Sequence, residues 1–587
     1  AISPQLKGKN NKIKETVINK FNSSIKIDGY LNEDVWKKIK PVTDFIQKEP
    51  VEGIPASEIT EVRMFYDEKN IYFGVICRDR EPEKIVANVL KRDAKLENSD
   101  YFEIFLDTFH DHRNAFYFAT NPLGVKRDVL IRDEGNNLNE NWNGIWECKA
   151  KIGDYGWSAE LVIPFRTLRF REGNNIIWGI NFGRMIARKR EESYWTPILR
   201  GYGFWGKYKI SKFGHLVGLK RIKHGGKIEL RPYILTGGTK SYKNGNAELD
   251  RKLNSGIDIK YRLTANFTAD FTYKTDFAQV EADLEQVNLT RFSLYYPEKR
   301  DFFLEGANIF RFGERFDPFE PGKNTFFFSR RIGISEDGEQ IPLLGGVKMT
   351  GKISNYNVGF INIVTDKKII LNSDNQKVII PRTNYTVLRV KKDIFSKSSI
   401  GFIGLNKQEK GGRVYNRGIG IDANFSLYTN LQFGGFLAKT FSPGITGKDY
   451  AGYVDFDYLS DFYNASFSYL DIGENFDAQM GFIKRTDIRT YKFSLGVGPR
   501  PGILNIRQIF IGPQLSQYTT DHKNKLLTRI ITPFMVIIFQ DGSFILFNYQ
   551  GNYEYLWEDF YLRSNTIIPE GIYKFNNLFL MLSLIHI

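Results

Sequence analysis

Carboxylates and guanidinium groups crowd into one stretch of this 587-residue chain, residues 276–340. Such groups have two uses in proteins. A pair of carboxylates can hydrolyse a glycosidic bond by acid–base catalysis, whereas carboxylates and arginines together form buried, bidentate ion pairs. Spacing along the chain does not separate the two, and structural ion networks are the commoner outcome. The residues expected in the network are Glu281, Asp283, Glu298, Arg300, Glu305, Arg330 and Arg331.

Two tryptophans with interleaved polar residues form a second candidate site. Trp142 and Trp146 lie in the loop-rich stretch 136–146. The apolar face of a sugar ring stacks on an indole, while sugar hydroxyls pair with amide, guanidinium and carboxylate groups. The alternative is that Trp146 packs in the core and only Trp142 is exposed. The carbohydrate-binding patch expected here consists of Trp142, Trp146, Asn121, Arg127, Asp128 and Asn143.

A third candidate is the segment 107–113, with the sequence DTFHDHR. Its oxygen-rich turn suits Ca²⁺, and His110 and His112, two residues apart, suit Zn²⁺. No further ligand is apparent. Asp107 and Asp111 are therefore the candidate ligands of a structural Ca²⁺, and a salt-bridged turn is the default interpretation.

Other chemistry has little support in the sequence. It contains no G-x-S-x-G elbow, no H-E-x-x-H, no phosphate-binding glycine loop and no C-x-x-C. Cys77 and Cys148 are too few for a metal framework and are expected to be unpaired, partly buried thiols. Net charge is +15, but no block of five or more Lys and Arg occurs, so anionic lipid headgroups are a simpler partner than nucleic acid.

The elements that would position these residues are β-strands. From about residue 226 onward, apolar or aromatic residues alternate with small polar ones, a period of two. No uninterrupted apolar run reaches about 18 residues, and nothing in this half is typical of a covering helix. Lipid is therefore expected to cover the apolar face of these strands. The predicted fold class is all-β, with a transmembrane antiparallel β-barrel of about 16 or more strands.

Three regions follow from these patterns. Residues 1–20 form a predicted flexible leader, residues 21–222 an antiparallel β-sandwich, and residues 223–587 the barrel. The charged, Phe-rich segment 276–340 is too long for a hairpin loop, and we expect a folded insertion that plugs or lines the lumen. Leu582 to Ile587 look like a translated adapter, which predicts that the barrel is cut short near residue 581 and has an unpaired edge.

Four stretches of the sandwich region resemble family-9 carbohydrate-binding modules: 27–36 (IDGYLNEDVW), 70–74 (NIYFG), 100–107 (DYFEIFLD) and 156–164 (GWSAELVIP). The resemblance implies a sandwich that binds sugar ends between two tryptophans, which cannot be aligned securely onto this chain. It also implies a structural calcium, which favours Ca²⁺ over Zn²⁺.

A second resemblance covers the joint with the barrel. Its stretches are 276–283 (DFAQVEAD), 287–291 (VNLTR), 296–308 (YPEKRDFFLEGAN) and 328–333 (FSRRIG). They resemble a largely uncharacterised family of Gram-negative outer-membrane proteins that carry a family-9-like domain ahead of a membrane barrel. Thr275 stands where that family usually has proline.

These expectations leave three functional hypotheses. The first is an outer-membrane protein that binds or takes up glycan, or acts as an envelope scaffold, with the sandwich periplasmic or at the barrel mouth. The second is a membrane-bound glycan hydrolase that uses carboxylates of the insertion. The third is a structural partner of another envelope protein. No catalytic nucleophile and no cofactor beyond the possible Ca²⁺ are predicted.

Overall fold

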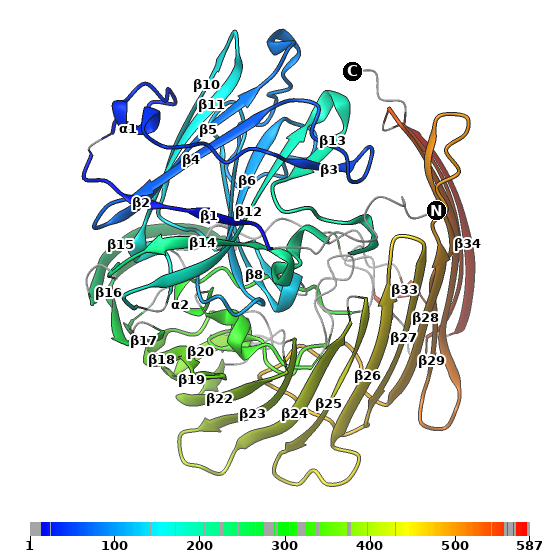
Figure 1. Cartoon of the computed structure of the whole chain (residues 1–587). Coiled ribbons are helices and arrows are strands. Elements are labelled where there is room, and N and C mark those ends of the chain that lie inside the picture. The colour runs from blue at the N-terminus through cyan, green and yellow to red at the C-terminus, as the bar shows by residue number, and fades with distance from the viewer. Residues whose placement is uncertain are drawn as a thin grey trace.

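The structure is a computed structural model of the whole chain, and it is almost entirely β (Figure 1). It describes residues 13–23, 25–135, 137–140, 142–170, 172–202, 206–223, 227–243, 246–264, 266–274, 287, 292–304, 306–313, 324–335, 340–371, 377–395, 397–428, 430–541, 543–556, 560–561, 567–568 and 571–583.

Two sheets packed face to face form the N-terminal sandwich. The larger contains β1 (Glu15–Val17), β3 (Ile46–Glu49), β6 (Tyr101–Asp107), β7 (Ala115–Thr120), β8 (Lys126–Arg132), β9 (Asn137–Asn139), β12 (Ile176–Ile186), β13 (Glu191–Tyr194) and β14 (Gly214–Leu219). The smaller contains β2 (Asn19–Lys20), β4 (Thr60–Tyr66), β5 (Asn70–Arg78), β10 (Glu147–Gly153) and β11 (Gly156–Pro164).

Apolar side chains from both sheets meet in the core of the sandwich. Trp146, Trp157 and Trp178 are buried there with phenylalanines of both layers. Trp36, on the short helix α1 (Asp34–Lys37), is buried against the outer face of the smaller sheet. Cys77 and Cys148 are free thiols, as predicted, and both are buried, Cys77 completely, rather than partly buried.

The flexible-leader prediction is wrong for residues 15–20. β1 pairs in parallel with β14, and β2 pairs in parallel with β4. These short strands form hydrogen bonds with backbone groups along two sheet edges, which explains why the segment is ordered. Residues 1–12 lie outside the described residues.

Sixteen strands form one continuous antiparallel sheet, which curves as a crescent in Figure 1. In spatial order they are β15 (Ile228–Lys243), β16 (Asn246–Thr264), β17 (Phe267–Tyr273), β18 (Leu343–Ile353), β19 (Tyr356–Thr365), β22 (Thr383–Ile394), β23 (Ser398–Glu409), β24 (Tyr415–Leu427), β25 (Leu431–Phe441), β26 (Tyr450–Leu459), β27 (Tyr463–Ile472), β28 (Ile488–Val497), β29 (Ile506–Thr520), β30 (Leu526–Phe539), β31 (Phe544–Leu556) and β34 (Gly571–Ser583). Within the described strands, β15 and β34 are the two edges and do not pair with each other.

The remaining elements are short. Two hairpins pair β20 (Lys368–Leu371) with β21 (Lys377–Ile380), and β32 (Phe560–Tyr561) with β33 (Ile567–Ile568). Helical turns are η2 (Pro82–Lys84), η3 (Asp133–Gly135), η4 (Phe165–Thr167), η5 (Ala187–Lys189), η6 (Arg200–Tyr202), η7 (Gly206–Tyr208), η8 (Ile210–Lys212), α2 (Asp301–Leu304), η10 (Ala307–Phe310) and η11 (Ser329–Arg331). No helix among the described residues is long and apolar enough to cross a membrane.

The two faces of the large sheet differ as the alternation predicts. On β24, Ile419 and Ile421 are 47% and 57% exposed, whereas Asp422 is 8% exposed and pairs with the buried Arg389 across the inner face. On β17, Phe271 and Tyr273 are exposed while Thr268, Asp270 and Thr272 are buried. The outer face of these strands is therefore apolar, whereas the inner face carries polar side chains and also apolar ones that are buried inside the sheet.

The insertion between β17 and β18 lies against the inner face of the sheet. Phe302, Phe303, Phe310, Phe312 and Phe326 form one buried cluster with inward side chains of the strands. Gly313 touches the Phe436 ring of β25 so closely that a Cβ there would clash at 2.2 Å. The predicted plug is thus confirmed for its described residues, because its aromatic side chains fill the concave side.

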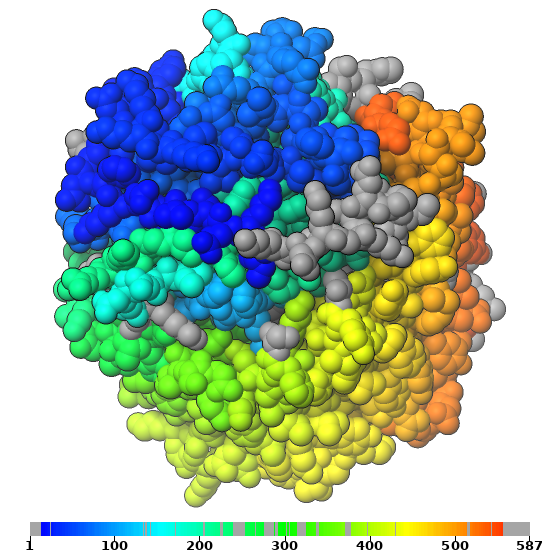
Figure 2. Space-filling model, viewed as in Figure 1, coloured from blue at the N-terminus to red at the C-terminus, as the bar shows by residue number. Residues whose placement is uncertain are grey.

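The sandwich docks on the rim that carries the short turns of the sheet. Figure 2 shows the sandwich, coloured blue to cyan, in contact with the green-to-orange sheet. The contacts come from turns spread along the sheet: Lys352 with Asp111 (3.0 Å), Asp393 with Arg113 (3.0 Å), Lys397 with Glu134 (2.7 Å), Asn430 Nδ2 with the Gly201 carbonyl (2.8 Å), and Arg507 with Glu49 (2.8 Å). The position of the sandwich is therefore fixed at many points.

Candidate functional site

A solvent-open cleft lies between the sandwich and the first strands of the large sheet. Its empty volume, open solvent included, is about 1160 Å³. The sandwich contributes the indole of Trp142 together with Arg132, Arg166 and Arg169, and the plug contributes Gly306 and Ile309. The sheet contributes Glu229, Lys260, Arg262, Thr268 and Lys352. Arg169 reaches across the cleft, where its Nη2 donates to Thr268 Oγ1 at 3.4 Å.

Trp142 is half-buried and backed by two phenylalanines of β7. Its ring lies 5.3 Å from Phe116 and 5.9 Å from Phe118, both in tilted or edge-on contact. Asp128 shapes the loop that carries Trp142, because its carboxylate accepts the Gly144 N–H and the Trp146 indole N–H. Trp142 thus lines the cleft with its ring supported by two phenylalanines, and an indole can stack on a flat apolar face of a ligand.

Two of the predicted ligand residues serve the fold instead. Trp146 is 2% exposed and packs on Phe118 in the core, which was the alternative interpretation of this residue. Asn121 is fully buried, with its amide donating to the Val89 carbonyl and its oxygen accepting the Leu123 and Val125 N–H groups. It organises the turn after β7.

Arg127 and Asp128 lie on opposite faces of β8, because neighbours on a strand alternate. Arg127 pairs with Glu140 at 2.8 Å, on the face away from Trp142. Asp128 is fully buried and also pairs with Arg92 at 2.8 Å, so it positions the loop. Burial raises the pKa of Asp128. Asn143 is exposed beside Trp142. Of the predicted patch, only Trp142 lines the cleft.

Sequence reasoning missed the basic residues of the cleft. Arg166 lies in η4, which follows β11, and Arg169 comes two residues after that turn ends. Lys260 and Arg262 belong to a strand far along the chain. Only the docking of the sandwich on the rim brings them opposite Trp142.

The proposed metal turn is a docking contact. Asp107 accepts the backbone N–H groups of Asp111 and His112, while Asp111 accepts those of Arg113 and Asn114 and pairs with Lys352 of β18. Within the described ranges, no group of three or more His, Cys, Asp and Glu residues is arranged to hold a metal ion. The geometry favours the salt-bridged turn, and Ca²⁺ stays an untested prediction.

The plug network is present in part. Arg300 binds Glu298 through two hydrogen bonds of 2.8 and 2.7 Å, and Ser329 donates to the same carboxylate. Arg330 and Arg331 donate to the carbonyls of Pro297 and Gly481. Both Glu298 oxygens are thus engaged, which favours a structural ion pair over an acid–base catalyst there. Glu281, Asp283 and Glu305 lie outside the described residues.

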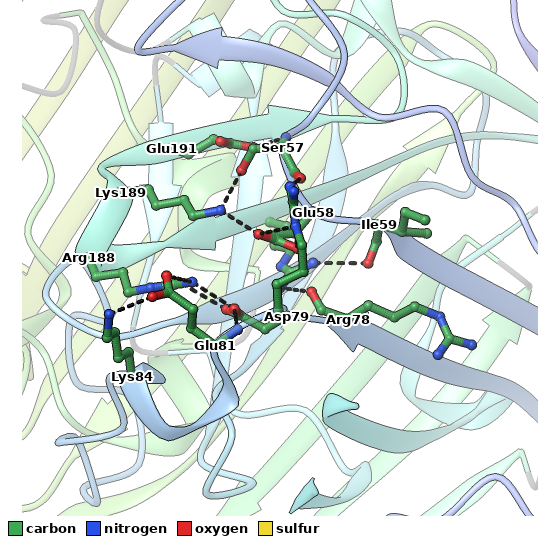
Figure 3. Close-up of polar contacts among 12 residues, drawn as sticks. Ser57, Glu58, Ile59, Arg78, Asp79, Glu81, Lys84, Arg188, Lys189 and Glu191 are labelled. Atoms are coloured by element: carbon green, nitrogen blue, oxygen red, sulfur yellow. Dashed lines mark hydrogen bonds and ion pairs between the residues drawn. The ribbon is translucent and has the colours of Figure 1, made fainter. Parts of the chain in front are cut away.

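A further charged cluster closes one end of the sandwich (Figure 3). Arg188 forms a bidentate pair with the buried Asp79 at 2.7 and 2.8 Å, and Lys189 pairs with Glu58 at 2.5 Å. These residues join β12 and β13 of the larger sheet to the β4–β5 side of the smaller one. Each carboxylate oxygen of Asp79 and Glu58 has a protein donor, so the cluster is a clasp between the sheets.

The fold defines a class of protein: a two-sheet sandwich joined to a barrel-type sheet that contains a plug. Residues 27–192 match the model described as carbohydrate family 9 binding domain-like. The model described as domain of unknown function DUF5916 matches residues 227–563, more than half of the chain, and the protein belongs to that family. A search of the curated proteins returned no match.

A search of the solved structures matched the chain to the following three proteins, among others. A family 9 module from Caldicellulosiruptor kristjanssonii in complex with cellotriose is 18% identical, over 35% of this chain and 95% of that chain, with a TM-score of 0.27. A protein from Bacteroides uniformis, described as carbohydrate-binding, is 12% identical over 35% of this chain and 100% of that chain, with a TM-score of 0.29. OccK8 (OprE) from Pseudomonas aeruginosa is 8% identical over 83% of this chain and 98% of that chain, with a TM-score of 0.27.

Proposed function

We propose that this protein is an outer-membrane β-barrel whose sandwich stands on the periplasmic side and binds glycan in the cleft at the barrel mouth. The observation that carries the proposal is the position of Trp142. This aromatic surface belongs to a domain of carbohydrate-binding type, and it faces a cleft shared with the rim of the barrel.

The membrane assignment rests on the outer face of the sheet. Large apolar side chains are exposed there strand after strand, among them Ile421, Leu437, Val454, Phe467 and Leu495. In water such a surface would be costly at about 25 cal/mol per Å², whereas lipid covers it without loss. Between the edge strands β15 and β34, each strand pairs with its neighbours along the ladder, as the hydrocarbon region requires.

The orientation rests on loop lengths and aromatic positions. The turns at 354–355, 395–397, 428–430 and 460–462 are short, while connections at the other rim include 366–382 and 473–487. In outer-membrane barrels the short turns face the periplasm. Exposed aromatic residues also gather at the short-turn rim, as an interfacial girdle would: Tyr356, Phe395, Tyr428, Tyr458 and Tyr463.

The glycan assignment rests on the chemistry of the cleft. Sugar rings bury an apolar face and expose hydroxyl groups, so a binding site combines an aromatic platform with convergent polar groups. Trp142 supplies the platform, and arginines, lysines and the Thr268 hydroxyl supply the polar groups. This side of the barrel faces the compartment that contains cell-wall and imported glycans.

Titration calorimetry on the full chain in detergent tests the proposal. Binding of an oligosaccharide from a mixed neutral and acidic panel is expected, and Trp142→Ala should weaken it about tenfold or more, equal to about 1.4 kcal/mol. Tyr30→Ala is the matched control, because Tyr30 is an exposed aromatic residue of the sandwich outside the cleft. Binding that survives in Trp142→Ala, or no binding by any sugar, would contradict the proposal.

A further inference from the structure

The loop 473–487 connects β27 to β28 at the rim opposite the sandwich, and it lies against the plug. Phe482 of the loop and Thr325 of the plug exchange two backbone hydrogen bonds of 2.8 Å, as residues of neighbouring strands do. The Met480 carbonyl also accepts the Phe328 N–H at 2.7 Å. Loop and plug are therefore joined through their main chains.

Side chains extend this contact. Phe476 and Met480 of the loop belong to the same buried cluster as the phenylalanines of the plug. The ring of Phe476 stacks on Phe326, with centroids 5.8 Å apart, and Arg331 of the plug donates to the Gly481 carbonyl at 3.3 Å. The plug is thus seated partly on this loop, and a displacement of the loop would loosen the plug.

One histidine contacts both ends of the loop. His522 lies in the turn 521–525 between β29 and β30, and its side chain is 10% exposed. Its Nδ1 lies 2.6 Å from Asp487 Oδ1 at the end of the loop, and its Nε2 lies 2.8 Å from Asp471 Oδ1 on β27, two residues before the loop begins. An ionised carboxylate only accepts hydrogen bonds, so the two contacts together require a proton on each ring nitrogen. His522 therefore bridges the two ends of the loop as an imidazolium.

Asp471 has two further partners, and both approach its other oxygen. Tyr469 donates to Asp471 Oδ2 at 3.0 Å, and Arg489 of β28 lies 3.7 Å from the same atom. The ring of Tyr450 on β26 packs edge-on against the imidazole, with centroids 6.5 Å apart. These neighbours hold Asp471 on the barrel wall. The contact between His522 and Asp487 then ties the far end of the loop to that wall.

Other charged groups lie in the surrounding loops. Lys448, just before β26, pairs with Glu474 of the loop at 3.1 Å. Within the turn, the Asp521 carboxylate accepts the backbone N–H groups of Lys523 and Lys525. Carboxylates, lysines, arginines and tyrosines ordinarily keep their charge between about pH 5 and 8, whereas imidazole ordinarily changes its charge in that range. A change of pH in this range therefore acts on the cluster through its histidine.

We propose that His522 is a proton-controlled latch, which keeps the loop 473–487 closed and, through the loop, keeps the plug seated in the barrel. With both ring nitrogens protonated, the imidazolium attracts Asp471 and Asp487 together. Loss of one proton as pH rises leaves a ring nitrogen facing a carboxylate oxygen, two acceptors with no hydrogen between them, and that contact becomes unfavourable. The latch is thus closed in acid and opens as pH rises. This inference does not depend on glycan binding.

Asp487 adds a reason for the loop to move when the latch opens. Its φ is 54°, in the left-handed region that residues other than glycine seldom adopt. Such a conformation persists only where surrounding contacts hold it. Without the imidazolium, the backbone at this end of the loop is expected to relax, and the seam between loop and plug is expected to open more often.

Hydrogen exchange read by mass spectrometry on the full chain in lipid nanodiscs tests the latch. The peptides to follow cover 476–484 of the loop and 324–332 of the plug, with the wall strand β25 as the internal reference. After correction for the intrinsic pH dependence of exchange, both peptides should exchange about tenfold faster at about pH 8.5 than at about pH 5.5, while β25 stays unchanged. Equal corrected exchange at the two pH values would overturn the latch, as would an equal rise in β25.

Substitutions assign the effect to this histidine. His522→Gln cannot carry the charge, so its loop and plug peptides should exchange fast at both pH values. Asp487→Asn should also lose most of the pH response. His215→Gln is the matched control, because His215 lies on β14 of the sandwich, and it should keep the native response. A response that survives in His522→Gln would overturn the proposal. Should His522→Gln fail to fold by circular dichroism, Asp487→Asn and the native pH series decide.

Discussion

The sandwich and the barrel use the same alternation of apolar and polar residues and place it in opposite ways. In the sandwich, Val62 and Val75 are completely buried between two sheets. In the barrel, Val454 and Ile421 are more than half exposed on the outside. A period of two therefore identifies strands in both regions, but it does not say which face meets water. The presence or absence of a covering layer decides which face meets water, since an apolar sheet face must contact another layer or lipid.

The two interiors differ as well. The core of the sandwich is aromatic and aliphatic, with tryptophans at its centre. The inner side of the barrel combines ion pairs of the wall, such as Arg389 with Asp422, with the phenylalanines of the plug. The barrel thus needs the plug to bury its inward apolar residues, whereas the sandwich is complete with its own strands.

The largest effect is expected from breaking the ion pair of the barrel wall. Arg389 Nη1 and Nη2 contact Asp422 at 2.7 Å each, and both residues are buried. Arg389→Met should cost about 3–5 kcal/mol of unfolding free energy, because it leaves a buried carboxylate unpaired. Urea unfolding of the chain in vesicles measures the loss.

Two controls sharpen that result. The double variant Arg389→Met with Asp422→Leu should recover much of the loss, since no buried charge remains. Arg188→Met breaks the equivalent pair with Asp79 in the sandwich. Equal losses at the two sites would mean that the lumen wall is as dry as the sandwich interior. An unchanged stability of Arg389→Met would show that the lumen pair is fully hydrated.

The second prediction compares exposed isoleucines of the two regions. Ile421 on β24 and Ile177 on β12 have similar exposure, 57% and 45%. Ile421→Arg should cost about 2–4 kcal/mol if the side chain lies near the bilayer midplane. Ile177→Arg should stay within about 0.5 kcal/mol, because Ile177 faces water. The measurement is folding into lipid vesicles, and equal small effects would contradict lipid contact at Ile421.

The smallest of these effects concerns the docking between the regions and its pH dependence. Burial alone would raise the pKa of Glu134 and of Asp111, but Lys397 and Lys352 outweigh it and hold both pKa values below their usual range. Depressed carboxyl pKa values stabilise the docked state above about pH 4 and lose that contribution as pH falls through them. We expect a loss of roughly 1–3 kcal/mol per pair in acid.

Energy transfer between dyes on cysteines introduced at Tyr30 and Tyr428 reports the docking. Cys77 and Cys148 should not take up label, because burial raises the pKa of each thiol to about 12. Lys352→Met combined with Lys397→Met should remove most of the pH dependence. Energy transfer that stays unchanged down to pH 3 in the labelled chain that keeps Lys352 and Lys397 would mean that these pairs do not hold the sandwich in place.

Much of the fold could be predicted from the sequence, and little of the cleft. The alternation expected after residue 226 matches the faces of β17 and β24 described above, because strand geometry is local. Arg127 was placed beside Trp142 by nearness in sequence, although the pleat of β8 separates it from Asp128. Asp111 was interpreted as a metal ligand because its partner, Lys352, lies 241 residues away.

The sequence by itself determined the strand-forming segments, the outward apolar face of the barrel and the aromatic, charged character of the plug, since these depend on residue type and a period of two. The tertiary structure alone decided where the sandwich docks and which side chains form the cleft. Those contacts join segments hundreds of residues apart, and no local periodicity encodes such a distance. Trp142 and Arg262 line the same cleft only because the sandwich docks on the rim of the barrel.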